Sequence, residues 1–114
     1  NLQDKYHSLD PENYPRTSHD AFLMDSFQLS RAIEDADSRG GKLFSIVHSH
    51  IDCGAYFSME DEKQMAMQDG SGQVFPAACY VVVSVDKKQP AESAVFYYDD
   101  ASGKFLKGNL ELVP

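Results

Sequence analysis

Cysteines are scarce in this sequence, which has only Cys53 and Cys79 among 114 residues. Small secreted domains that depend on disulfide bonds carry a framework of spaced cysteines, and this chain has none. Long apolar runs are also missing, because no stretch approaches the ~20 residues that a membrane-spanning helix needs. The N-terminus lacks a charged segment followed by an apolar one. We therefore expect a cytoplasmic protein without a membrane span or a secretion signal.

Basic residues are few compared with acidic ones. Lys and Arg total 10 against 18 Asp and Glu, which gives a formal net charge of -8. Such a surface repels phosphate backbones and anionic lipid, so nucleic acids and membranes are poor candidates for partners. Apolar residues still make up 42% of the chain, enough for one packed core. The composition predicts a single globular domain over residues 1–114.

The first part of the chain contains one clear helix. Residues 1–17 are polar and show little periodicity, which indicates a surface loop. The apolar-rich segment 19–24 suits a strand. Asp25 can cap a helix that continues to about Ser38, and Arg39-Gly40-Gly41 is a typical stop signal. The apolar residues at helical spacing predict one buried stripe, formed by Leu29, Ala32, Ile33 and Ala36.

The second part is richer in strands. The compact apolar segment 42–48 predicts a central strand that ends at His48. A helix is expected to begin at Ser58, with Asp61 completing a capping box, and to continue to about Asp69. Further strands are expected at 78–85, 92–98, 104–107 and 110–113. This order of elements predicts an α/β fold with a mixed sheet.

The most informative residues are His48, His50, Ser58 and Asp61. Side chains alternate along a strand, so two imidazoles two residues apart point the same way and can reach one ion. A carboxylate in the first turn of the next helix can complete a site of two His and one Asp. Such a site leaves a fourth position for water, as catalytic zinc sites do. Each residue alone also has a purely structural interpretation: strand-end histidine, loop histidine and helix cap.

The spacing His48-x-His50-x7-Ser58-x-x-Asp61 resembles the metal motif of JAMM (MPN-plus) metalloproteases. The resemblance covers roughly Ser18 to Val113, and the loop after His50 is similar to that of bacterial members. It implies an MPN fold, similar to that of cytidine deaminases, with a curved mixed sheet flanked by helices. It also implies hydrolysis after the C-terminal Gly-Gly of a ubiquitin-like or sulfur-carrier protein. The oligomeric state is left open.

The resemblance assigns roles to individual residues. His48, His50 and Asp61 would be zinc ligands, and Ser58 would stabilise the oxyanion, which does not exclude its capping the helix. The general acid/base of the family is a glutamate on an early strand, and no residue of this sequence matches it. We infer that this strand is missing from the chain, so the chain as given would be a weak catalyst.

Several residues near the motif have two interpretations each. Asp52 is either a support for a ligand histidine or an exposed loop charge. Tyr56 and Phe57 form either a wall for a Gly-Gly tail or an anchor in the core. Cys53 is either a small, partly buried thiol or a fourth ligand that makes the zinc structural. A noncatalytic MPN scaffold that binds a partner is the main alternative to an enzyme.

Overall fold

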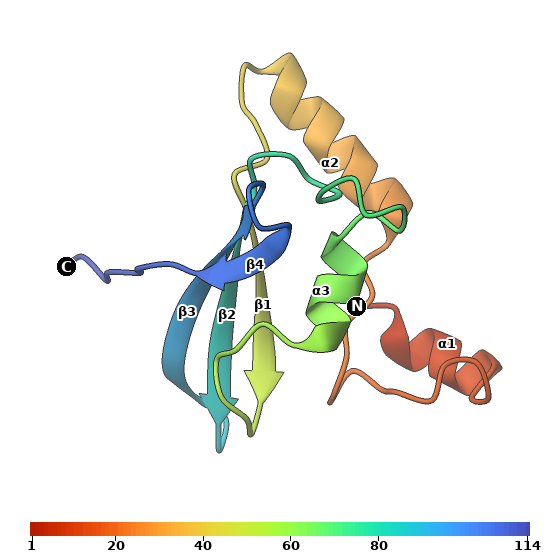
Figure 1. The fold of residues 1–114 in the computed structure, drawn as a ribbon. Coiled ribbons are helices and arrows are strands. Elements are labelled where there is room, and N and C mark those ends of the chain that lie inside the picture. The colour runs from red at the N-terminus through yellow and green to blue at the C-terminus, as the bar shows by residue number, and fades with distance from the viewer. The chain divides into compact units, whose positions relative to one another are not determined.

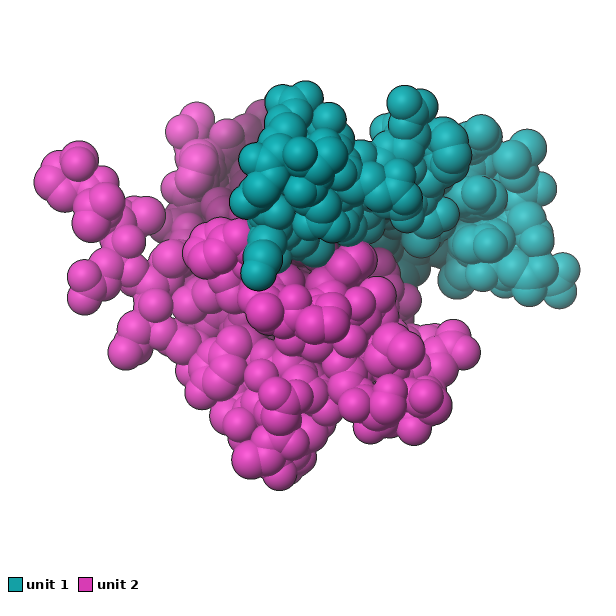
Figure 2. Space-filling model, turned by 90° about the horizontal axis from the view of Figure 1, so that it is seen from above, with its two compact units in different colours: residues 1–43 teal, residues 44–114 magenta.

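The computed structural model describes residues 1–114, with three α-helices and four β-strands (Figure 1). In chain order the elements are α1 (Gln3–Leu9), α2 (Ser26–Ser38), β1 (Ser45–Ile51), α3 (Met59–Met65), β2 (Cys79–Asp86), β3 (Gln89–Asp99) and β4 (Lys104–Lys107). The chain divides into two compact units, residues 1–43 and 44–114, which are coloured separately in Figure 2. None of the helices has the length and apolar character that a membrane span requires.

Helix α1 lies where the sequence predicts a loop, so the loop prediction for residues 1–17 is wrong in this part. The Asn1 Oδ1 atom accepts a hydrogen bond from the Gln3 amide at the start of the helix, at 3.0 Å. The rings of Tyr6 and Tyr14 stack with centroids 5.0 Å apart. His7 Nδ1 also lies 2.7 Å from the Tyr14 carbonyl oxygen. These contacts with the segment that follows stabilise α1, although its sequence has no apolar periodicity.

The segment 19–24 is not a strand, which corrects a second prediction. The Leu2 amide donates to the Leu23 carbonyl oxygen at 2.7 Å, and the Leu23 amide donates to Asn1 Oδ1 at 2.9 Å. The backbone groups of this segment are thus bonded to the first two residues of the chain. A short apolar run becomes a strand only where a partner strand is available.

Helix α2 confirms its predicted bounds. The Asp25 carboxylate accepts hydrogen bonds from the amides of Phe27 and Gln28, at 3.0 and 3.1 Å, and so caps the helix. Gly40, with φ of +80°, ends it. The predicted apolar stripe is less buried than expected, because Ala32 is exposed while the other three positions are half-buried.

The second unit is built on a four-stranded sheet in the order β1-β2-β3-β4. Strand β1 is parallel to β2, and the other two pairs are antiparallel, which confirms the mixed sheet. Strand β1 is an edge strand rather than the central strand predicted. It also begins at Ser45 and continues to Ile51, so both motif histidines lie within it.

The sheet buries one face more deeply than the other. Tyr80 and Val82 of β2 are fully buried, and Ile46, Ala94 and Phe96 of the neighbouring strands are almost so. The opposite face is more open; for example, Val47 is 62% exposed. This alternation is the period of two expected for strands with one buried face. His48 and His50 of β1 share the parity of Ile46 and therefore face the core side.

Two further predictions differ from the structure. Helix α3 ends at Met65 instead of Asp69, because Ala66 is extended and forms an isolated bridge with Gln73. The Val74 amide also donates to the Met65 carbonyl oxygen at 2.8 Å, which turns the chain back. The C-terminal strand predicted at 110–113 is absent, and Leu112 is 88% exposed.

Candidate metal centre

Both histidines of the motif project from the same face of β1. His48 lies opposite Val82 of β2 and His50 opposite Ser84, so a well-packed neighbouring strand fixes their backbone. Their Nε2 atoms are 3.2 Å apart. The alternation of side chains along the strand thus brings the two imidazole nitrogens to one point.

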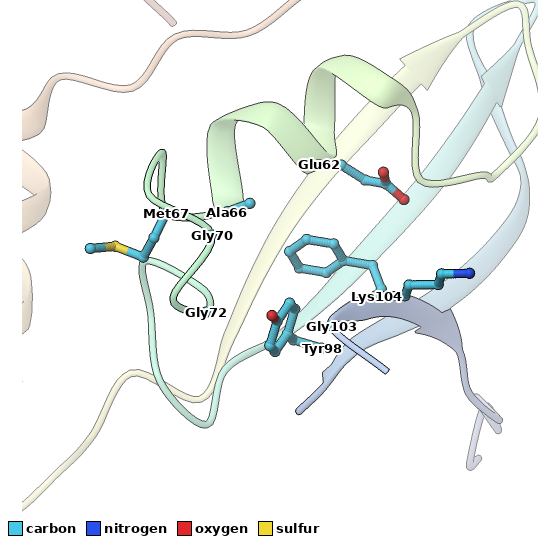
Figure 3. A pocket seen from close by; sticks show the side chains of 9 residues that line it. Glu62, Ala66, Met67, Gly70, Gly72, Tyr98, Gly103 and Lys104 are labelled. Carbon is cyan, nitrogen blue, oxygen red and sulfur yellow. The ribbon is translucent and has the colours of Figure 1, made fainter. Parts of the chain in front are cut away.

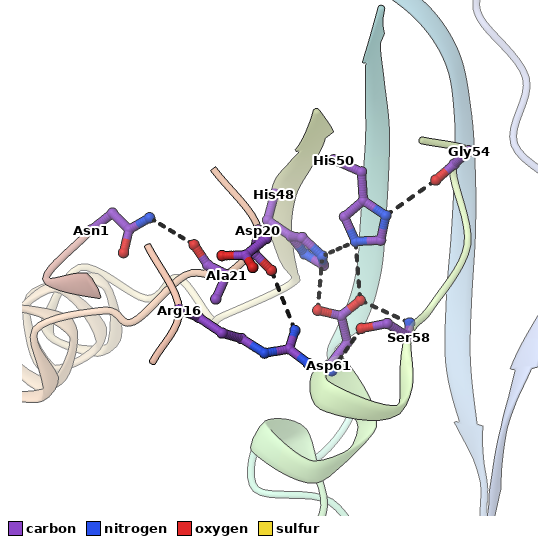
Figure 4. A network of polar contacts seen from close by, with 9 residues as sticks. All are labelled: Asn1, Arg16, Asp20, Ala21, His48, His50, Gly54, Ser58 and Asp61. Atoms are coloured by element: carbon purple, nitrogen blue, oxygen red, sulfur yellow. Dashed lines mark hydrogen bonds and ion pairs between the residues drawn. The ribbon is translucent and has the colours of Figure 1, made fainter. Parts of the chain in front are cut away.

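Asp61 completes the group from the first turn of α3, as Figure 4 shows. Its Oδ1 atom lies 3.1 Å from His48 Nε2, and its Oδ2 atom lies 3.2 Å from His50 Nε2. His48, His50 and Asp61 together form a group that can hold a metal ion. The sequence-predicted ligands therefore converge, and they come from two different elements.

The donor set and spacing of this group fit zinc. Ligands placed tetrahedrally about 2.0–2.1 Å from zinc are roughly 3.3 Å apart. The two imidazole Nε2 atoms are 3.2 Å apart, close to that value, and each lies 3.1–3.2 Å from a different oxygen of the Asp61 carboxylate. Two imidazole nitrogens and one carboxylate are common zinc ligands. Three protein ligands also leave a tetrahedral position for water or substrate.

The helix start positions the carboxylate by a capping box. The Ser58 Oγ atom accepts a hydrogen bond from the Asp61 amide at 3.1 Å, and the Ser58 amide donates to Asp61 Oδ2 at 2.9 Å. The predicted box is confirmed. The reciprocal bonds fix both the helix start and the carboxylate, so Ser58 and Asp61 are held next to each other beside the two histidines.

The electrostatics of the group favour an ionised carboxylate. Burial raises the pKa of Asp61, but hydrogen bonds from His48 and Ser58 outweigh this effect and hold the pKa below its usual value. The side chains are only slightly exposed, at 6% for Asp61, 8% for His48 and 12% for His50. A cation bound at this point would lie next to a charged carboxylate that is largely shielded from solvent.

The remaining ring nitrogen of His50 has its own partner, which the sequence reading missed. His50 Nδ1 lies 3.1 Å from the carbonyl oxygen of Gly54. A carbonyl oxygen only accepts hydrogen bonds, so this contact requires the proton on Nδ1 and leaves the Nε2 lone pair for a metal. The only signal in the sequence is a glycine four residues after the histidine, which is a weak one.

Asp52 and Cys53 lie on the loop between β1 and α3 but do not join the group. The Asp52 Oδ1 atom accepts a hydrogen bond from the Lys87 amide at 3.2 Å, so its carboxylate holds the β2–β3 turn rather than a ligand histidine. Cys53 is a free and exposed thiol instead of a partly buried one. It is also outside the group of residues that can hold a metal.

The structure separates the two aromatic residues that precede Ser58. Phe57 lies in an aromatic cluster, with ring centroids 5.2 Å from Tyr80 and 5.4 Å from Phe96, and it anchors the loop in the core. Tyr56 is 51% exposed and packs edge-on against His50 at 4.9 Å. Of the two residues, only Tyr56 is both exposed to solvent and packed against the candidate ligand His50. A residue that contacts a substrate beside the metal site needs both properties.

A cavity of about 350 Å³ lies near the end of α3 (Figure 3). Its lining residues come from α3, from the loop after it and from β3 and β4; they are Glu62, Ala66, Met67, Gly70, Gly72, Tyr98, Gly103, Lys104 and Phe105. None of the three ligands lines this cavity. Glu62, which follows Asp61 in α3, lines the cavity and is not among the residues that can hold a metal.

A family model described as "Prokaryotic homologs of the JAB domain" matches residues 3–97, which is most of the chain. No curated protein and no solved structure matches. The matched range contains β1, α3 and all three candidate ligands.

Proposed function

Because the chain belongs to the family of prokaryotic homologs of the JAB domain, we propose that it carries the metal site of a zinc-dependent peptidase or isopeptidase. The observation that carries the proposal is the convergence of His48, His50 and Asp61, whose ligand atoms, one from each residue, all lie within 4.8 Å of one another. We further propose that the bond cleaved follows the C-terminal Gly-Gly of a ubiquitin-like or sulfur-carrier protein, as the motif resemblance implies. A bound zinc ion supplies Lewis acidity and lowers the pKa of water.

Ser58 is proposed to stabilise the oxyanion that forms at the scissile carbonyl. In the capping box its Oγ accepts a hydrogen bond from the Asp61 amide, which uses a lone pair of the hydroxyl. The hydroxyl hydrogen remains available as a donor. Because the same box holds Ser58 beside Asp61, the hydroxyl oxygen is fixed before substrate binds, and its hydrogen can rotate towards the oxyanion.

The surface beside the ligands supports a polypeptide substrate. Tyr56 and Met59 flank Ser58 in sequence and are 51% and 88% exposed. An exposed apolar side chain at each end of this short segment offers contact to an extended chain that passes the metal. The reaction also needs a general acid/base. Glu62 does not fill that role, because it lines the cavity near the end of α3.

A cleavage assay on the full-length protein tests this proposal. The substrate is a sulfur-carrier protein that ends in Gly-Gly and is fused to a short peptide, with zinc present. We expect the wild type to release the carrier and the His48→Ala variant to lose at least 100-fold in rate. Equal cleavage by both proteins would disprove the metal role. Tight carrier binding without cleavage by any variant would instead indicate a noncatalytic scaffold.

A further inference from the structure

The loop between β1 and α3 is fastened to the β2–β3 hairpin at several points. The Asp52 amide donates to the Val85 carbonyl oxygen at 2.8 Å. The Ser84 hydroxyl donates to the Cys53 carbonyl oxygen at 2.6 Å. These bonds fix the backbone on the N-terminal side of Gly54, the residue whose carbonyl oxygen contacts His50.

The next peptide group, between Gly54 and Ala55, is bonded on both of its sides. Its carbonyl oxygen lies 3.1 Å from His50 Nδ1, and its amide donates to Glu92 Oε1 at 2.9 Å. The chain has no cis peptide bonds, so this planar group directs its C=O and N–H in opposite directions. The peptide group therefore links the carboxylate of Glu92 to the ring of His50.

A β-bulge aims Glu92 at this peptide. Val83 pairs with Ser93 and Val85 pairs with Pro90, so Ala91 and Glu92 both lie opposite the single residue Ser84. The extra residue on β3 changes the direction of the side chains there, as bulges near functional sites often do. Ser84 and Glu92, on the two sides of the bulge, thus both hold the loop.

Gly54 leaves room for this arrangement. A Cβ atom at that position would lie 3.1 Å from Glu92 Oε1, closer than most such contacts in proteins. A side chain at position 54 would therefore require the carboxylate to shift by a few tenths of an ångström. The glycine and the glutamate, 38 positions apart, are matched to each other.

We propose that Glu92 is a positioning residue of the metal centre and acts through the Gly54–Ala55 peptide. Its carboxylate oxygen accepts from the Ala55 amide and fixes that peptide, which holds the Gly54 carbonyl in place as an acceptor for His50 Nδ1–H. The bond holds the His50 ring so that Nε2 stays at the point beside His48 and Asp61 where a metal would bind, as supporting residues around metal sites do. The proposal rests on the metal site proposed above.

Three variants of the chain test this role. Glu92→Gln keeps an oxygen acceptor for the Ala55 amide but removes the charge, whereas Glu92→Ala removes both. Glu92→Asp keeps the charge but withdraws it by one methylene group. Glu111→Ala is the matched control, because this glutamate lies in the exposed C-terminal segment. Thermal unfolding first establishes which variants fold.

Two readouts are used. Titration with Co²⁺, followed by its d–d absorption, gives the metal affinity. Nitrogen-15 NMR of the metal-free protein gives the His50 tautomer. We expect Glu92→Ala and Glu92→Asp to weaken Co²⁺ binding roughly tenfold and to populate both tautomers, while Glu92→Gln stays within about threefold of the wild type. If Glu92→Ala does not fold, the Co²⁺ affinity and the His50 tautomer of Glu92→Asp test the role of Glu92 instead.

The outcomes separate the two proposals. Unchanged affinity and an unchanged tautomer in the folded Glu92 variants would overturn the role of Glu92 and leave the metal site intact. A wild type that binds no Co²⁺ would overturn the metal site. In that case the tautomer, measured without metal, would still decide whether Glu92 orients His50.

Discussion

The Nε2 atom of His48 lies 3.1 Å from the Oδ1 atom of Asp61, and this contact joins the edge strand β1 to the first turn of α3. The strand supplies the imidazoles and the capping box supplies the carboxylate, so the site depends on both elements being in place. Changes to either partner should therefore affect metal binding and local stability in different proportions.

Replacement of Asp61 separates these two effects. Asp61→Asn keeps a side-chain oxygen that can accept from the Ser58 amide, whereas Asp61→Ala removes half of the capping box. We expect both variants to lose metal affinity by more than the roughly 10- to 100-fold typical of a supporting residue. Urea unfolding in EDTA should show a further loss of about 1 kcal/mol for Asp61→Ala only. Equal stability of the two variants would contradict the capping role of the side chain.

Ser58 is expected to serve both the helix and the reaction. Ser58→Ala should cost about 1 kcal/mol of unfolding free energy through the lost cap. It should also lower kcat by about 10²- to 10³-fold through the lost oxyanion donor. Ser58→Thr, which keeps the hydroxyl, is the control and should retain most of the unfolding free energy and most of kcat. A Ser58→Ala variant that lost stability but kept kcat would reduce Ser58 to a helix cap.

Tyr56 and Met59 should govern substrate binding rather than the chemical step. Tyr56 is exposed beside His50, and Met59 is exposed at the start of α3, so truncation of either to Ala removes apolar contact with the substrate chain without exposing the core. We expect KM to rise about three- to tenfold with kcat little changed, the sign of lost uniform binding. Val74→Ala, which removes an apolar side chain 41% exposed elsewhere, is the control. A fall in kcat with constant KM would argue against this assignment.

Deprotonation of Tyr80 is expected to lower the stability of the protein at alkaline pH. Burial raises the pKa of its hydroxyl to about 12, above the usual 10, and the hydroxyl donates to Gln73 Oε1 at 2.7 Å. The unfolded chain releases this proton first, so the contribution of Tyr80 is complete below pH 10 and is lost as the pH rises to about 12. The loss is on the order of 2 kcal/mol.

The comparison with Tyr80→Phe isolates this effect from other titrations. The variant should be less stable at neutral pH by about 1 kcal/mol, because Gln73 loses its donor. Its stability should then fall less than that of the wild type between pH 10 and 12, as measured by urea unfolding. Parallel curves for the two proteins would show that Tyr80 is not the group responsible.

The sequence was sufficient for those parts of the site that depend on local rules. Two histidines two residues apart on a strand share a face regardless of how the strand pairs in the sheet. The Ser58–Asp61 spacing likewise defines a capping box within one helical turn. The helix from Ser26 to Ser38 likewise follows from its cap, its periodicity and its glycine stop. In each case the determining residues are near one another in sequence.

The features that could not be predicted depend on distant contacts. The segment 19–24 stays out of the sheet because Asn1 and Leu2 bind its backbone. The contact between His50 and the Gly54 carbonyl involves a backbone atom, which carries no residue-type signal. Glu92 reaches the loop only because a bulge shifts β3, and no local pattern reveals the position of that bulge.

Zinc content measured after equilibrium dialysis tests the central claim most directly, because it depends on neither substrate nor the general base. We expect about one zinc per chain for the wild type and for the distant control Glu111→Ala, and essentially none for His48→Ala and His50→Ala. A wild type without stoichiometric zinc, or a His48→Ala variant that retains as much zinc as the wild type, would contradict a metal centre at His48, His50 and Asp61.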